Sequence, residues 1–201
     1  VLFDLLGLLK STLLDRVFLQ PDERECLPAA QVLAFARDLG AIPAYAYLGD
    51  VGESPTGDKK AEKFEDDFIE ELVAFLGEIG MPAITYMPPR NTAEQMARIA
   101  DLADANGLLE VSGVDINTPR QVFNCPELQR PELDHLNDAT WAMVAHEQLA
   151  EHDLALGLFA DDSPLAGLPL KERVQRYSAI GRALVQDGLP VADAAEQLNA
   201  G

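Results

Sequence analysis

Cysteine and long apolar runs are scarce in this 201-residue chain, and each scarcity excludes a class of protein. Its two cysteines, Cys26 and Cys125, are too few for a disulfide framework and indicate reduced thiols in a cytosolic protein. No apolar run approaches the roughly 18 residues that a membrane span requires. The apolar opening, residues 1–9, also lacks the basic start and the cleavage site of a signal peptide. We therefore expect a cytoplasmic protein without a membrane partner.

Positive charge is the second shortage. The chain has 15 Lys and Arg residues against 34 Asp and Glu residues, and its net charge is −19. A field of that sign repels phosphate backbones. The nearest approach to a basic patch is Lys59, Lys60 and Lys63, and acidic residues flank it. We expect no nucleic-acid partner, and we interpret the acidity first as a source of solubility.

Familiar catalytic motifs are missing as well. The sequence has no glycine-rich phosphate loop, no Gly-x-Ser-x-Gly and no Cys/His cluster with zinc spacing. Glu147 follows His146, but a zinc-protease helix needs its second histidine four residues after the first. The next histidine, His152, is six residues away. We interpret these two histidines and His135 as structural or exposed.

What the chain does contain is an alternation of helical and strand patterns. Apolar residues recur at helical spacing in several segments, each followed by a glycine and a short apolar run. The helices expected from this spacing are 28–39, 64–79 and 92–106. The strands expected from the apolar runs are 41–48, 83–87 and 108–112. Such alternation is typical of a parallel sheet with right-handed crossovers, so the predicted fold class is α/β, with about three strands.

Further regions flank this unit. Residues 1–17 have leucines along one side at helical spacing, and we expect a helix that packs against another part of the protein. Residues 49–63 form a polar loop of a length that is either functional or disordered. After residue 117 the pattern is helical, and the helices expected there are 137–152, 168–186 and 191–199. We divide the chain into an α/β unit over 1–120 and an all-helical C-terminal tail over 121–201.

The most informative stretch is Pro82–Asn117, which reads as strand, helix and strand. Thr92 and Gln95 have the spacing of a capping box at the start of the helix. Asn106 and Gly107 form a C-cap signal at its end. Polar residues follow the carboxyl ends of both strands, and ligands of α/β folds bind at that edge. We expect the functional site there.

Two groups of side chains at this edge suggest chemistry. Asp115 and Asn117 stand two residues apart after a strand, so in an extended segment both point the same way and can face one ligand or metal. An Asx-turn that closes the strand is the alternative. Arg90 precedes a helix N-terminus, where a phosphate or carboxylate is favoured, although a surface arginine paired with an acid fits equally. Arg120 offers a similar but less supported contact.

Three segments of the chain resemble the PHP (polymerase and histidinol phosphatase) family, and most closely its small metal-dependent phosphoesterases. Residues 84–95, ITYMPPRNTAEQ, resemble the family pattern I-E-V-Y-x-P-R-H-[ST]-x-E-Q. Residues 107–117, GLLEVSGVDIN, resemble G-L-x-x-[ST]-G-S-D-F-H. The turn at 46–49, AYLG, stands where the family has a His-Pro turn. The likeness covers roughly residues 28–120.

The resemblance implies a distorted (β/α)7 barrel whose strand ends hold two or three divalent metals, Zn, Mn or Fe, that activate water for phosphoester hydrolysis. With three strands, this chain would form a partial, barrel-like parallel sheet. Asp115 matches a metal ligand of the family, and Asp115 and Asn117 are the catalytic residues that the resemblance implies. The implied substrate is small and phosphorylated or otherwise anionic. The predicted substrate-binding residues are Arg90, Asn91, Arg120 and Tyr47.

The sequence also departs from the family pattern. Tyr47 and Asn117 replace two histidines, and both are poorer ligands for zinc or manganese than imidazole. The chain begins with Val1 and lacks the family's His-x-His motif. We therefore expect it to be the C-terminal part of a hydrolase, inactive without a preceding segment of the same polypeptide. The alternative is a non-enzymatic binding or regulatory module on a degenerate PHP scaffold. Unpaired strand edges in such a piece also favour a homodimer.

Overall fold

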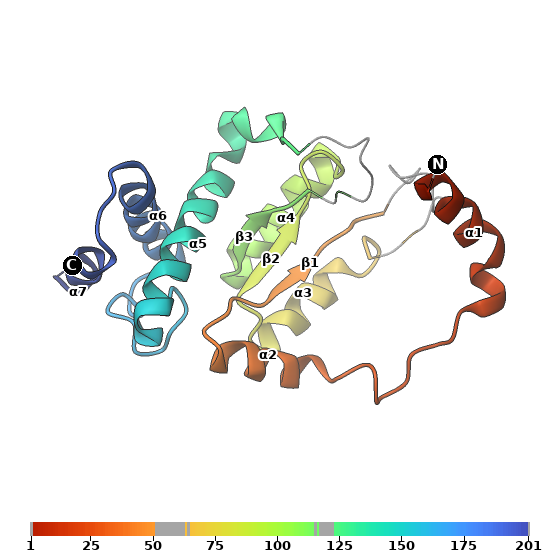
Figure 1. The fold of residues 1–201 in the computed structure, drawn as a ribbon, viewed down its shortest axis with the longest axis horizontal. Helices are drawn as coiled ribbons and strands as arrows, with labels where there is room; N and C mark the ends of the chain where they lie inside the picture. Colours follow the sequence, from red (N-terminus) through yellow and green to blue (C-terminus); the bar gives the residue numbers. More distant parts are fainter. Residues whose placement is uncertain (1, 51–62, 64, 115, 117–122, 201) are drawn as a thin grey trace.

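The computed structural model describes residues 2–50, 63, 65–114, 116 and 123–200. Its centre is a three-stranded parallel sheet in the order β1-β2-β3 (Figure 1). The strands are β1 (Ala44–Ala46), β2 (Ala83–Tyr86) and β3 (Leu109–Ser112). The predicted α/β class and the parallel three-stranded sheet are confirmed. The sheet in the described part of the chain is open and does not close into a barrel.

Three helices alternate with the strands. They are α2 (Ala29–Asp38), α3 (Ile69–Glu78) and α4 (Ala93–Asn106). The glycine after each helix has a positive φ, +69° at Gly40, +75° at Gly80 and +65° at Gly107. This left-handed conformation ends a helix and costs glycine little. The glycine found in the sequence at each helix-to-strand junction is therefore explained by the left-handed conformation that it adopts there.

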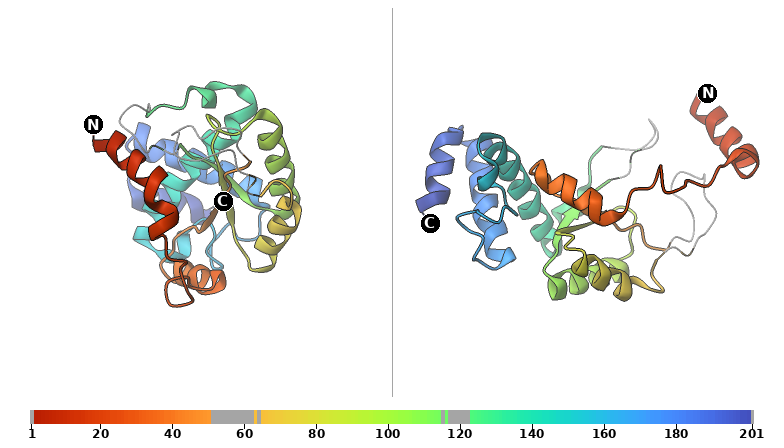
Figure 2. Two further views of the ribbon diagram at one scale, coloured as in Figure 1. Left: turned by 90° about the vertical axis from the view of Figure 1, so that its right-hand side faces the viewer. Right: turned by 90° about the horizontal axis from the view of Figure 1, so that it is seen from below.

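One core lies between the sheet and the helices α3 and α4, which lie side by side on the same face (Figure 2). Ile84 and Tyr86 of β2 are almost fully buried there, together with Val73 of α3 and Ile99 of α4. Apolar residues at helical spacing on α3 and α4 thus cover the sheet, although Phe75 of α3 also has this spacing and is 49% exposed. This core fixes where the carboxyl ends of the strands lie.

A second core joins the sheet to the C-terminal helices. These are α5 (Asp134–His152), α6 (Leu170–Gln186) and α7 (Val191–Ala200), with short 3-10 helices η1 (Pro126–Gln129), η2 (Pro131–Leu133) and η3 (Leu154–Leu156). Helix α5 runs beside β3 (Figure 1), and its buried alanines Ala139, Ala142 and Ala145 let neighbouring elements approach closely. In the described part of the tail every regular element is a helix, as predicted.

Helix α1 (Leu2–Val17) differs from the expectation of packing. None of its residues is buried, and it lies apart from the other described helices and strands (Figures 1 and 2). Leu9 and Leu13, on its apolar side, are 44% and 40% exposed. Helical spacing shows which side of a helix is apolar, but it does not supply the surface that covers that side. Among the described residues, no helix is long and apolar enough to cross a bilayer.

Candidate functional site

The candidate site is the edge of the sheet where the three parallel strands end. Tyr47 follows β1, the turn 87–91 follows β2, and Gly113 follows β3, where its N–H donates to the carbonyl of Tyr86. Of the predicted site residues, Tyr47, Arg90 and Asn91 lie at this edge. The other three, Asp115, Asn117 and Arg120, lie outside the described residues.

Asn91 ties two of the turns together. Its side chain is 6% exposed. Its Oδ1 accepts the N–H of Met87 at 2.8 Å, and its Nδ2 donates to the carbonyl of Leu48 at 2.9 Å. Both ends of the amide are therefore engaged within the chain. In this arrangement Asn91 positions the loops after β1 and β2.

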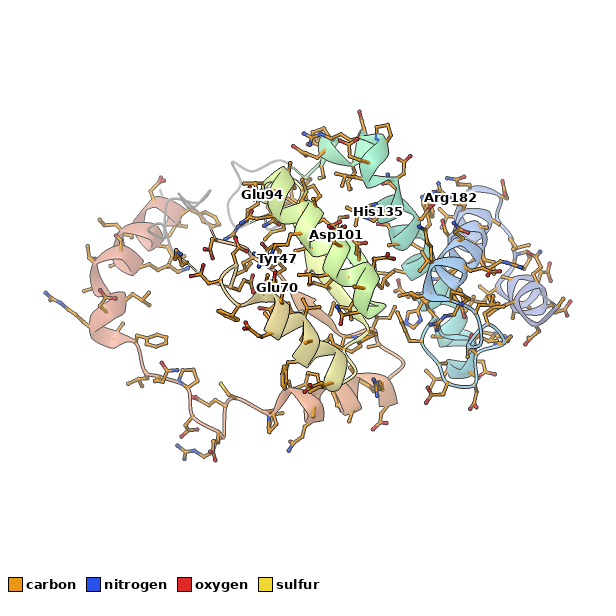
Figure 3. All side chains as sticks on the ribbon, turned by 180° about the vertical axis from the view of Figure 1, so that it is seen from behind. Tyr47, Glu70, Glu94, Asp101, His135 and Arg182 are labelled. Atoms are coloured by element: carbon orange, nitrogen blue, oxygen red, sulfur yellow. The ribbon has the colours of Figure 1, made fainter. Side chains whose placement is uncertain are left out.

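Tyr47, which is labelled in Figure 3, is buried, and its hydroxyl donates to Asp66. Burial raises the pKa of Tyr47 far above its usual range, and the hydrogen bond and charge of Asp66 add to the rise. Burial also works to raise the pKa of Asp66, but hydrogen bonds from Tyr47 and Gln95 outweigh it, so the pKa of Asp66 is lowered. Tyr47 is therefore a neutral phenol paired with an ionised carboxylate.

Glu65 is a central residue that the sequence analysis missed. It is 5% exposed. Its Oε1 accepts the N–H of Leu48 at 2.6 Å and the N–H of Gly49 at 2.9 Å, while its Oε2 accepts the hydroxyl of Tyr45. Buried carboxylates require such donors. The available sequence signal was the run of acids ahead of an apolar helix, since carboxylates are favoured at helix N-termini.

Gln95 and Arg98 of α4 complete the same group. The Nε2 of Gln95 donates to Asp66 at 2.8 Å and to the carbonyl of Asp50 at 2.9 Å. Arg98 donates to the carbonyl of Asp66 at 2.8 Å and to Glu70 at 2.6 Å. We call this set the β1-loop network. Its members are Tyr45, Tyr47, Asp50, Glu65, Asp66, Asn91, Gln95 and Arg98.

The β1-loop network is closely packed around Gly49. Gly49 has φ +69°, and a Cβ there would lie 2.7–2.9 Å from the side chains of Gln95, Asn91 and Tyr47. Only glycine fits this position without moving those groups. The network therefore fixes the backbone after β1 and leaves no space at Gly49 for a larger side chain.

Arg90 behaves differently from its neighbours. Its Nε is buried and has no hydrogen-bond partner among the described residues. Arg90 stands two residues before Thr92, the N-cap of α4. The capping box forms there as predicted: Thr92 Oγ1 accepts the N–H of Gln95 at 3.2 Å, and Gln95 Oε1 accepts the N–H of Thr92 at 2.9 Å. The first helical N–H groups, of Ala93 and Glu94, are the ones that this box does not use. We take the guanidinium of Arg90 and these two N–H groups together as a candidate anion site.

A metal site is not visible in the described residues. No group of three or more His, Cys, Asp and Glu side chains in that part of the chain is arranged to hold a metal ion. The predicted ligand Asp115 lies outside the described residues, so the predicted metal site stays a prediction. Tyr47, which stands where the PHP pattern has a histidine, is a neutral phenol whose hydroxyl donates a hydrogen bond to Asp66.

Comparisons with known proteins give no relative for this chain. No family model matches it, and no curated protein or solved structure matches it either. The likeness to the PHP family therefore rests on the sequence segments alone.

Proposed function

We propose that the carboxyl edge of the sheet binds a small phosphorylated or carboxylate anion, as a binding module on a degenerate PHP-like scaffold. The observation that supports this proposal is the buried Nε of Arg90, which has no partner among the described residues and belongs to a residue two positions before the N-cap Thr92. A buried donor without an acceptor is unfavourable by about 1–3 kcal/mol. An oxyanion would satisfy both the guanidinium and the free helix amides.

The neighbouring residues have supporting roles in this proposal. Tyr47 and Asn91 are engaged within the chain, so they position the two loops instead of contacting the ligand. Glu94, in the first turn of α4, is labelled in Figure 3 and would oppose an anion at the helix start. The net charge of −19 repels anions at long range. Short-range donation from Arg90 would therefore have to supply most of the affinity.

The test uses thermal unfolding with inorganic phosphate and with acetate. We expect phosphate to raise the melting temperature of the wild-type chain and of Arg130→Ala, a matched control at an exposed arginine. Arg90→Ala should lose the shift, because it removes the buried donor. Arg90→Lys should keep only part of it, since lysine retains the charge without the planar pair of donors. A full phosphate shift in Arg90→Ala would exclude this site.

Metal-dependent phosphoester hydrolysis is the second candidate, favoured by the likeness of residues 84–95 and 107–117 to phosphoesterase segments. Asp115 would then be a metal ligand, with Asn117 beside it and Arg120 near the substrate. A divalent metal would act as a Lewis acid and activate water. A preceding segment of the polypeptide would supply further ligands.

The two candidates predict different responses to metal. Hydrolysis predicts that the longer polypeptide binds Zn, Mn or Fe and cleaves a generic phosphoester such as p-nitrophenyl phosphate, and that Asp115→Ala abolishes both. Simple anion binding predicts a phosphate shift that chelator does not change. If the longer polypeptide holds no metal, the hydrolytic candidate is rejected and the binding module remains.

A further inference from the structure

Strand β1 leaves one side of the sheet open. It pairs with β2, and among the described residues no strand pairs with its other side (Figure 1). Along a parallel strand, the backbone N–H and C=O groups of successive residues point alternately to the two sides. Tyr47 donates its N–H to the carbonyl of Thr85, so Tyr45 and Tyr47 face β2. The N–H and C=O groups of Ala44 and Ala46 therefore point outward, and both alanines are exposed.

This open edge lacks the features that usually keep sheet edges from pairing. Such edges are protected by charged side chains or by prolines within the strand, and the strand Ala44–Ala46 has neither. Pro43 stands just before it, but by the same alternation its nitrogen faces β2, so the outer side loses no donor. Beyond the other end, Glu65 is turned inward and accepts the N–H of Leu48 at 2.6 Å. The outward groups of β1 are therefore available for pairing.

An apolar stripe of α3 lies beside this edge. Gly77 faces α4, since a Cβ there would lie 3.9 Å from Asn106 Oδ1. Phe75 is two residues away, about 200° round the helix, and Phe68 is seven residues further back, which is about two turns. Both phenylalanines thus point away from α4, and they are 49% and 47% exposed. In the strand order β1-β2-β3, the side of α3 away from α4 is the β1 side.

We propose that this edge joins two copies of the chain, which pair their β1 strands antiparallel across a two-fold axis at Tyr45. In that register Ala44 of one copy lies opposite Ala46 of the other, and each such pair exchanges two hydrogen bonds. The two pairs use every outward N–H and C=O group of both alanines. The same axis brings Phe68 and Phe75 of the two copies to the same face of the joined sheet.

The match of this surface to itself is what favours a second copy as the partner. A two-fold contact requires one patch that is complementary to itself. Ala44 and Ala46 supply equal numbers of donors and acceptors, symmetrically placed about Tyr45. The α3 stripe beside them is apolar, so it also pairs with its own copy. The other exposed apolar surfaces, on α1 and around Phe35 of α2, offer no strand edge.

The size and charge of the surface indicate a weak dimer. Two half-exposed phenylalanines offer roughly 200 Å² per copy, well below the roughly 800 Å² that each partner buries in a standard interface. The net charge of −19 on each copy also opposes association at long range. Salt screens that repulsion. We therefore expect a reversible dimer with a micromolar dissociation constant, which tightens as salt is added.

The first test measures mass by sedimentation equilibrium on the whole chain. Between about 5 µM and about 500 µM, which brackets a micromolar dissociation constant, the average mass should rise from that of one copy, 21.8 kDa, toward twice that value. Raising the salt from about 0.05 M to about 0.5 M should move this rise to lower protein concentration, because it screens the repulsion.

Amide exchange followed by NMR tests the strand pairing itself. In a single copy the N–H groups of Ala44 and Ala46 are open to water, while those of Tyr45 and Tyr47 are protected by β2. In the dimer all four should be protected. Protection of Ala44 and Ala46 should therefore rise with protein concentration, and protection of Tyr45 and Tyr47 should be present throughout.

Two variants remove the contact by different routes. Ala46→Pro removes an outward N–H, whereas Ala46→Val is the control at the same position and keeps it. Phe75→Glu places a charge in the apolar stripe, and Val185→Glu makes the same change of charge at an exposed apolar residue of α6. Ala46→Pro and Phe75→Glu should each raise the dissociation constant by about tenfold or more. The two controls should stay within about twofold of wild type.

Several results would overturn this dimer. One is a wild-type mass of a single copy up to about 500 µM, and another is a mass above two copies, because a two-fold contact closes at two. An unchanged mass in Phe75→Glu would also overturn it, and this variant decides alone if Ala46→Pro does not fold. Loss of the dimer in the double variant Leu9→Glu and Leu13→Glu would place the contact on α1 instead. None of these outcomes involves Arg90 or phosphate, so the anion site is tested separately.

Discussion

Gly181 of α6 packs directly against the backbone of Trp141 of α5: a Cβ on Gly181 would lie 2.0 Å from the Trp141 carbonyl oxygen. Glycine in a helix interior is unfavourable by about 1 kcal/mol relative to alanine, so its presence here needs a reason. The close approach of the two helices is that reason. Arg182, the next residue, lies over the Trp141 ring at 5.3 Å and extends the same contact.

Gly181→Ala is therefore expected to destabilise the fold, although alanine is the better helix former. The new methyl group would force α5 and α6 apart, and overpacking of this kind is unfavourable by about 1–3 kcal/mol. Gly77→Ala is the matched control, because a Cβ there meets nothing closer than Asn106 Oδ1 at 3.9 Å. It should stabilise α3 by about 0.5–1 kcal/mol. Urea unfolding of both variants measures the difference, and equal effects would contradict the close packing of Gly181.

Glu65 is expected to be the most sensitive member of the β1-loop network. Glu65→Ala leaves the N–H groups of Leu48 and Gly49 and the hydroxyl of Tyr45 without their acceptor. Each buried donor left unpaired is unfavourable by about 1–3 kcal/mol, so we expect a total loss of about 3 kcal/mol or more. The measurement is the free energy of unfolding in urea.

Two comparisons isolate this effect. Glu65→Gln keeps one carbonyl acceptor for the two backbone groups, so it should lose clearly less stability than Glu65→Ala. Glu71→Ala removes an exposed carboxylate from α3 and should change stability by less than about 0.5 kcal/mol. If Glu65→Ala were as mild as Glu71→Ala, the network would not be what holds the turn after β1.

The capping box at the start of α4 gives a smaller expected effect. Thr92→Ala removes the acceptor for the N–H of Gln95 and should destabilise the fold by about 1 kcal/mol. Gln95→Ala should be more damaging, because Gln95 also donates to Asp66 and to the carbonyl of Asp50. Thr12→Ala, on the exposed helix α1, is the control and should have little effect. The reverse order of Thr92→Ala and Gln95→Ala would show that Gln95 acts only as a cap.

The features that the sequence predicted correctly are local ones. The capping box of Thr92 and Gln95 depends on residues three apart, and Gly40, Gly80 and Gly107 each end the helix beside them. Such signals depend only on residues that lie within about one helical turn of each other in the sequence. The strand pattern was also read correctly, but β1 is shorter than the predicted 41–48, and Pro43 stands directly before it.

The features that the sequence did not predict depend on distant contacts. Glu65 reaches Leu48 and Gly49 across 16 or 17 residues, and His135 meets Tyr86 across 49. Neither contact is indicated by a helical or strand spacing of residues in the sequence. Nothing in the sequence indicates that the amide of Asn91 joins two loops; its predicted contact with substrate stays a prediction. Residue type and spacing indicate what a side chain can do, while the fold decides which partner it meets first.

Helix α1 gives the last prediction, which concerns its amide exchange. A 16-residue helix with no buried residue is marginal in water by itself, because most helix stability in proteins comes from packing. We therefore expect the amides of α1 to exchange close to the rate of an unfolded chain, while those of the buried stretch of α5 are strongly protected. The double substitution Leu9→Glu and Leu13→Glu should leave the free energy of unfolding within about 0.5 kcal/mol of wild type.

A matched control for this substitution is Leu33→Glu in α2. Leu33 is 3% exposed, so an unpaired charge there should be strongly destabilising, whereas Leu9 and Leu13 are exposed leucines on α1. Strong protection of α1 in the wild-type chain would contradict the prediction. Light scattering would then distinguish two causes: a doubled mass means that α1 is covered by a second copy, and an unchanged mass means that it folds back on its own chain. In either case Leu9→Glu with Leu13→Glu should remove the protection, because a buried carboxylate cannot replace an apolar contact.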